Sequence, residues 1–395
     1  MMLIKKAVSL VLSCSVCLSS ISCASTDIAG MGRGSALQMY DDETRMWKRS
    51  KEMQEVIEKS GHIYEDEALG EYIISVLHKL IGDIAETNNL DLKVGIIKDP
   101  FFNAFSLPDG VIYIHTGLLA NSENEAQLAA VLGHEASHFL LRHALKQHRS
   151  TMNKTAFFNV VNMTVGTAAC VVAGAAGALL AGVLGKYGLN ASIFGYSRQM
   201  EREADENAFK LIKEAGYNPH EAKKFLETLA EMTEGEDKIP YFYSTHPRIK
   251  ERIETFEELI KESGSPAEGI DNADIYNQMV KNLVLENAEL DMKRKNGLKS
   301  ARRQIARYNN MYADDFKAYY LLGKLNALEG NKEEAEERLK KSIELMPDFA
   351  ESHKELGLLY YKDDKKQDAR AEFEKYLALE PQAKDAEYVR GYMNE

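Results

Sequence analysis

The last third of this 395-residue chain repeats itself with a period of 34 residues, and this feature constrains the fold more than any other. Two copies agree at six positions, Tyr319, Leu322, Gly323, Ala335, Leu339 and Pro347 in the first and His353, Leu356, Gly357, Ala369, Phe373 and Pro381 in the second. A weaker copy one period upstream places small or apolar residues at Leu285, Ala288, Ala301, Ile305 and Tyr308. A repeat of this length is a helix pair that buries its apolar face only by stacking on a neighbour.

Leu-Gly, a later Ala and a closing Pro at this period are the tetratricopeptide pattern. We therefore expect residues 271–395 to form an α-solenoid with a concave surface for a peptide or a partner protein. The segment SGSPAEG before it has linker composition. The expected domains are a signal segment (1–24), a catalytic domain (25–262), a linker (263–270) and the repeats (271–395).

The pentapeptide HEASH predicts a metal centre in the first domain. Four residues turn a helix through about 400°, so His134 and His138 share one face and reach one zinc ion. Glu135 between them is placed to act as a general base. A bare HExxH occurs by chance in roughly one chain of this length per hundred, so further ligands must support it.

A third zinc ligand has to come from a second helix, because Leu141 and Ala144 exclude the HExxHxxGxxH arrangement. A helix expected from Ser197 to Ala215 carries Glu201 and Asp205 four residues apart, hence on one face. Glu201 could ligate the metal while Asp205 accepts the second N–H of an imidazole. The alternative is a solvated charged face. Apolar positions show that this helix packs on the protein, namely Ala204, Ala208, Phe209, Leu211 and Ile212.

The remaining pattern of the first domain predicts helices around a small sheet. Apolar residues at helical spacing run from about Glu65 to Asn88, and LDLKVGIIK alternates as a strand does. Two β-rich runs flank Pro108-Asp109-Gly110 and predict a hairpin. Ser122 and Glu125 form a capping-box pattern for the HEASH helix, and a further helix is expected over His220 to Met232. The fold class is mainly α.

The N-terminus has the pattern of an export signal: MMLIKK is followed by a long uncharged segment. Cleavage after Ala24 and lipidation of Cys23 both remain open. Three of the four cysteines lie in this segment, which excludes a disulfide framework in the later domains. A net charge of −12 argues against nucleic-acid binding. The uncharged, Gly/Ala-rich residues 155–185 are expected to form a buried helical hairpin or a mobile flap, with membrane insertion the less favoured alternative.

Together HEASH, EREAD, NAFSLPDGVIYIHTGLL and THP resemble the HtpX-type gluzincin metallopeptidases. The resemblance implies one zinc ion per chain with His134, His138 and Glu201 as ligands, Glu135 as the base and Asp205 orienting a ligand. It also implies a cleft strand that a substrate can extend, formed by Asn103, Ala104, Phe105 and Ser106.

The family also places a histidine at the metal where this chain has His246. It would stabilise the oxyanion or act as a fourth ligand that keeps the enzyme latent. Arg252 is a weaker candidate for positioning the substrate or His246. The other histidines, His115, His143 and His148, are expected to be structural or exposed, since the last two fall off the ligand face of the helix.

The expected function is that of an exported zinc endopeptidase of the periplasm. Its substrates would be misfolded or stalled envelope proteins, above all outer-membrane proteins, and its repeats would bind substrate or the β-barrel assembly machinery. The alternative is a chaperone or assembly adaptor with minor or silent proteolysis, which the repeats alone would support.

Overall fold

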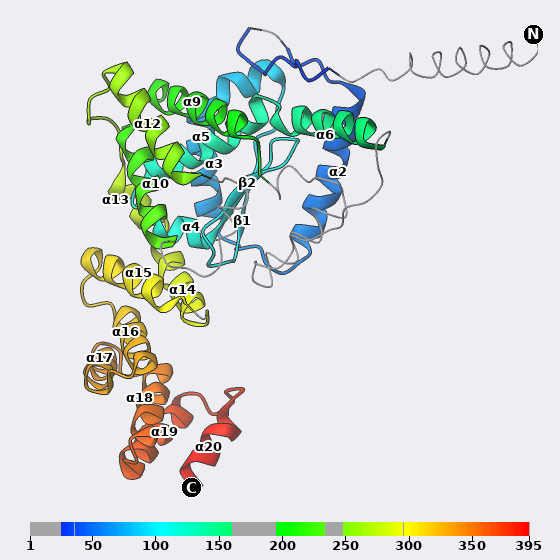
Figure 1. Ribbon diagram of the computed structural model, residues 1–395. Coiled ribbons are helices and arrows are strands. Elements are labelled where there is room, and N and C mark those ends of the chain that lie inside the picture. Colours follow the sequence, from blue (N-terminus) through cyan, green and yellow to red (C-terminus); the bar gives the residue numbers. More distant parts are fainter. Residues whose placement is uncertain (1–24, 35, 160–194, 234–247, 295, 395) are drawn as a thin grey trace, which may run out of the picture.

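The computed structural model describes residues 25–159, 195–233 and 248–394, apart from residues 35 and 295. Figure 1 shows a rounded body of helices around a small sheet, and a row of helix pairs that leads from it to the C-terminus. The signal segment and most of residues 155–185 lie outside the described residues, so the predictions for them remain predictions. Among the described helices, none is long and apolar enough to cross a membrane.

The structure describes eight helices of the body, of which those over residues 67–88, 125–140, 198–214 and 220–233 were predicted from the sequence and the other four were not. They are α2 (Asp41–Glu58), α3 (Glu67–Asn88), α4 (Thr116–Asn121), α5 (Glu125–Leu140), α6 (His143–Asn159), α9 (Arg198–Glu214), α10 (His220–Thr233) and α12 (Ile249–Ser263).

The sheet has the strand order β1–β3–β2, with β1 (Val94–Ile97) parallel and β2 (Ala104–Ser106) antiparallel to β3 (Ile112–His115). The predicted hairpin is confirmed. Its turn is closed by the Gly110 N–H, which donates to the Leu107 carbonyl at 2.9 Å. Gly110 has a φ of 91°, a backbone conformation that favours glycine.

The HEASH helix α5 lies at the centre of the body, and all of its 16 residues are buried. The predicted capping box at Ser122 is wrong. Asn124 caps α5, and its side chain accepts a hydrogen bond from the Gln127 N–H at 2.9 Å. Ser122 instead ends the short helix α4, and its hydroxyl donates to the Leu118 carbonyl. The sequence pattern failed here because two helices meet within a few residues.

Helix α9 begins and ends where it was expected, with Ser197 as its N-cap. It packs on α5 through small side chains, since Gly133 lies against Ala208 and Ile212. This contact brings the acidic face of α9 to the histidine face of α5, which the metal prediction requires.

The repeats form the predicted α-solenoid. The helix pairs are α14 (Lys281–Met292) with α15 (Leu298–Met311), α16 (Phe316–Glu329) with α17 (Lys332–Leu345), and α18 (Ala350–Lys362) with α19 (Lys366–Leu379), followed by α20 (Ala386–Asn394). The repeated glycines allow the two helices of a pair to touch. A Cβ on Gly323 would lie 2.5 Å from Leu339, and one on Gly357 would lie 2.6 Å from Phe373, the same contact one repeat later.

The expected linker is bound to the body along its last residues. Ile270 pairs with the loop after α9, because its N–H donates to the Gly216 carbonyl and its carbonyl accepts from Asn218. Next, the Asp271 carbonyl accepts from the N–H groups of Glu125 and Ala126 at the start of α5. The first turn of the HEASH helix is thus fixed in part by the segment that leads to the repeats.

The first helices after the linker complete the core of the body. Tyr276 of α13 (Ala273–Met279) is fully buried, and its hydroxyl donates to the Leu119 carbonyl at 2.7 Å. Arg307 of α15 donates to the Ala120 carbonyl. One continuous cluster of buried apolar side chains therefore runs from the body into the solenoid.

Candidate metal centre

Helix α5 points both histidines of HEASH to the same place, as its geometry requires. The Nε2 atoms of His134 and His138 lie 3.1 Å apart, and the two side chains are 4% and 0% exposed. At these exposures, the imidazoles are shielded from bulk water.

The carboxylate of Glu201 on α9 completes a group of three. Its Oε2 lies 3.5 Å from Nε2 of His134, and its Oε1 lies 3.5 Å from Nε2 of His138. One donor atom from each residue falls within 4.8 Å of the other two. Atoms about 2.1 Å from a tetrahedral zinc ion lie about 3.4 Å from one another. The nitrogen and oxygen donors and their spacing therefore fit a zinc ion.

Asp205 lies behind His134, one turn along α9 from Glu201. Its Oδ1 accepts a hydrogen bond from His134 Nδ1 at 2.8 Å, which leaves Nε2 of that ring to face Glu201. Burial alone would raise the pKa of the Asp205 carboxyl, but the charges of Arg252 and His134 outweigh it and hold that pKa below its usual value. Asp205 is therefore ionised at neutral pH.

Arg252 of α12 pairs with Asp205 at this buried position. Its Nη2 donates to Oδ1 at 2.8 Å and its Nε donates to Oδ2 at 3.0 Å. From the sequence, Arg252 was a weaker candidate for positioning the substrate or His246. The structure places it behind a metal-facing imidazole, since its Nη2 also lies 3.0 Å from His134 Nδ1. His246 lies outside the described residues, so both of its predicted roles remain predictions.

Glu135 faces the sheet. The Ser106 hydroxyl, at the end of β2, donates to Glu135 Oε2 at 3.2 Å, and both residues are buried. The strand that the sequence assigned to the cleft is thus in contact with the expected base. Successive side chains of β2 point to opposite faces of the sheet. Ala104 packs in the main core, whereas the Phe105 ring stacks on Tyr113 in a separate cluster, with ring centroids 5.5 Å apart. Asn103 is fully buried just before the strand.

His143, which was expected to be structural or exposed, is buried and contacts an expected metal ligand. His143 Nδ1 lies 2.9 Å from Nδ1 of His138, and its Nε2 lies 3.2 Å from a carboxylate oxygen of Glu203. Burial lowers the pKa of His143, so its imidazole is neutral near pH 7. The other two histidines stay apart from the centre: His115 is buried beside Asp99, and His148 is half-buried on α6.

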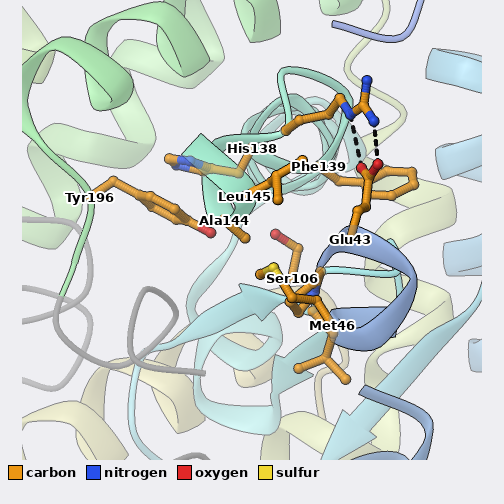
Figure 2. A pocket seen from close by; sticks show the side chains of 11 residues that line it. Glu43, Met46, Ser106, His138, Phe139, Ala144, Leu145 and Tyr196 are labelled. Carbon is orange, nitrogen blue, oxygen red and sulfur yellow. Dashed lines mark hydrogen bonds and ion pairs between the residues drawn. The ribbon is translucent and has the colours of Figure 1, made fainter. Parts of the chain in front are cut away.

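A narrow cleft opens beside the centre. Figure 2 shows Tyr196 and His138 on one side of it, Ser106 opposite and Met46 of α2 below. The Tyr196 ring stacks on His138, with centroids 3.9 Å apart and planes 16° from parallel. The Glu43–Arg142 ion pair is part of the lining of the cleft. The cleft therefore lies between the end of β2 and His138, one of the expected metal ligands.

A helix with HExxH beside a helix with ExxxD defines the gluzincin class of metallopeptidase site. Residues 67–260 match the model of Peptidase family M48, so this part of the chain is a Peptidase family M48 domain. This confirms the resemblance seen in the sequence at the level of the family.

Two curated relatives illustrate the similarity. The chain is 35% identical over 195 residues to the mitochondrial metalloendopeptidase OMA1 of Schizosaccharomyces pombe, covering 49% of this chain and 53% of that protein. It is 27% identical over 196 residues to the β-barrel assembly-enhancing protease of Yersinia pestis, covering 49% of this chain and 39% of that protein. The chain thus spans about half the length, or less, of these relatives.

Among solved structures, the chain is similar to the TPR2AB domain of yeast Sti1 in its complex with pHSP90. The identity is 10% and the TM-score 0.28, with 70% of this chain and 98% of that chain covered. A TM-score of this size adds nothing to the repeat geometry described above.

Proposed function

We propose that this protein is a zinc-dependent endopeptidase. The observation that carries the proposal is the spacing of the three buried donor atoms of His134, His138 and Glu201, with Glu135 beside them. A bound zinc ion would supply Lewis-acid activation of water and of the scissile carbonyl.

The protein's own side chains account for proton transfer. Glu135 takes a proton from the attacking water and gives it to the leaving amine. The hydrogen bond from Ser106 holds the Glu135 carboxylate on the cleft side of α5. Asp205 keeps the His134 proton on Nδ1, so that Nε2 remains a donor to the metal.

An extended polypeptide is the substrate class that this site favours. Strand β2 is one of the two edge strands of the described sheet, and it ends at Ser106 beside Glu135. A substrate segment that pairs with β2 as an antiparallel strand would carry a peptide bond to the base. Folded proteins do not offer such a segment, so we propose unfolded or stalled proteins as substrates.

The place of action in this proposal is the periplasm, with envelope proteins as substrates and the β-barrel assembly machinery as a partner of the repeats. The export pattern of residues 1–24 supports it, as does the similarity to the β-barrel assembly-enhancing protease of Yersinia pestis. Anchoring through a lipidated Cys23 is part of the same proposal and would be tested by mass spectrometry of the mature N-terminus.

The decisive experiment is degradation of an unfolded test protein by purified protein loaded with one equivalent of zinc, with Glu135→Gln beside it. We expect wild type to cleave, and Glu135→Gln to bind zinc equally well but cleave about 10²–10⁴-fold more slowly. Equal rates in both, or a wild type that binds no zinc, would overturn the proposal. His246→Ala, run in parallel, separates its two roles: a faster rate identifies a blocking ligand, and a slower rate identifies oxyanion stabilisation.

The solenoid supports a second candidate, a chaperone or assembly adaptor. Suppression of aggregation of an unfolded outer-membrane protein measures that function without cleavage. Suppression by wild type and by Glu135→Gln, with no cleavage by wild type, would favour the adaptor over the endopeptidase.

A further inference from the structure

A chain of three polar groups, of which His138 and His143 are buried, begins at the second expected ligand and leads away from the metal position. His138 Nδ1 lies 2.9 Å from His143 Nδ1, and His143 Nε2 lies 3.2 Å from Oε2 of Glu203. The side chains of His138 and His143 are both 0% exposed, whereas that of Glu203 is 35% exposed. The chain thus connects the interior of the site to the surface of α9.

The direction of the hydrogen bonds follows from the ligand role of His138. A histidine that binds metal through Nε2 carries its proton on Nδ1. Nδ1 of His143 can accept that proton only when it carries none itself, so the proton of the His143 ring lies on Nε2. This proton faces the Glu203 carboxylate, which can only accept when ionised. One arrangement of protons therefore satisfies all three groups, and it is the one that leaves Nε2 of His138 open.

The turn between α5 and α6 brings His143 into contact with His138. On a continuous helix, residues five apart differ by about 140° in direction and cannot touch. Helix α5 ends at Leu140, and Arg142 adopts a left-handed conformation with a φ of 58°. The Arg142 side chain is held by Glu43 at 2.8 Å and by the Gln38 carbonyl at 3.1 Å. This turn starts α6 at His143 and returns its ring to His138.

A second contact fixes the plane of the same ligand. Tyr196, just before α9, stacks on the His138 ring. Stacking on Tyr196 thus restricts tilting of the His138 ring, and the contact with His143 restricts its rotation. The other ligand has a different arrangement, since His134 donates directly to the carboxylate of Asp205.

We propose that His143 and Glu203 are positioning residues for the metal ligand His138. His143 accepts the Nδ1–H of His138, and Glu203 fixes the proton of His143 on the far nitrogen. The inference rests on the proposed function, because it assumes that His138 binds metal. In this proposal His143 orients His138 in the way that the Asp205 carboxylate orients His134.

The experiment measures zinc affinity of the purified, metal-free protein by competition with a chromophoric chelator. The variants are His143→Leu, which removes the acceptor, and His143→Asn, which places an oxygen near the position of Nδ1. Glu203→Ala removes the outer group. Glu206→Gln is the matched control, because Glu206 is an exposed carboxylate of α9 that pairs with Arg202. Circular dichroism and the melting temperature of each metal-free variant report its folding.

We expect His143→Leu to weaken zinc binding about 10- to 100-fold, the usual range for a lost partner of a metal-bound histidine. His143→Asn should recover most of that loss, Glu203→Ala should lose affinity by a smaller factor, and Glu206→Gln should match wild type. The visible spectrum of the Co²⁺ form should change in His143→Leu and not in Glu206→Gln, because a rotated ligand alters the coordination geometry.

Two results separate the possible failures. If wild type binds no zinc, the proposed function itself fails. If wild type binds zinc and every folded variant of His143 and Glu203 binds it as tightly as wild type, only the positioning role is overturned. Glu203 is partly exposed, so its variant folds and keeps the test decisive even where the leucine variant does not fold.

Discussion

The buried pair of Asp205 and Arg252 offers the sharpest test of how the centre is held. Asp205 is fully buried and accepts hydrogen bonds from both the Arg252 guanidinium and His134. Asp205→Asn preserves the shape of the side chain but leaves the Arg252 charge without its closest partner. Breaking a buried ion pair in this way costs about 3–5 kcal/mol. Since asparagine still accepts one hydrogen bond, we expect a loss of about 3 kcal/mol in the free energy of unfolding.

The assay is urea unfolding of the metal-free protein, followed by far-ultraviolet circular dichroism. The double variant Asp205→Asn with Arg252→Met leaves no unpaired charge and should recover most of the lost stability. Its zinc affinity should nevertheless stay at least about tenfold below wild type, because His134 has lost a charged acceptor. A loss below about 1 kcal/mol in the single variant, or a double variant less stable than the single one, would refute the reasoning.

Three further predictions concern the junction, the repeats and the N-terminal helix. Glu125→Gln should lower the free energy of unfolding in urea by about 2 kcal/mol, because the buried carboxylate accepts hydrogen bonds from two tyrosines and an asparagine at 2.7–2.8 Å. A variant as stable as wild type would contradict this prediction. Gly357→Ala should cost about 1–3 kcal/mol, since its Cβ would lie 2.6 Å from an aromatic ring. Gly391→Ala, which meets nothing, is its control. Hydrogen bonds from Arg149 hold the pKa of Asp42 below its usual value, so this pair should stabilise the protein above about pH 4 and lose that effect as the pH falls further. The stability difference between wild type and Asp42→Asn, measured at pH 7 and pH 3, should therefore shrink at the lower pH.

Much of the site was readable from the sequence because its spacings lie within single helices. His134 and His138 are four residues apart, and so are Glu201 and Asp205, which fixes their shared faces before any packing is known. The repeat was readable for a similar reason. A period of 34 residues reproduces one contact, that of Gly323 with Leu339, at Gly357 with Phe373.

Contacts between elements were decided only by the tertiary structure. His143 looked remote because the sequence shows no sign that Arg142 would adopt a left-handed turn and reverse the chain. Arg252 lies beside His134 because it pairs with Asp205, which is 47 residues away in the sequence. Local spacing is set by helix geometry, which each residue carries with it, whereas a contact across elements depends on how buried charges find partners once the core has formed. The sequence therefore determined which side chains face the centre from α5 and α9, and the fold decided what lies behind them.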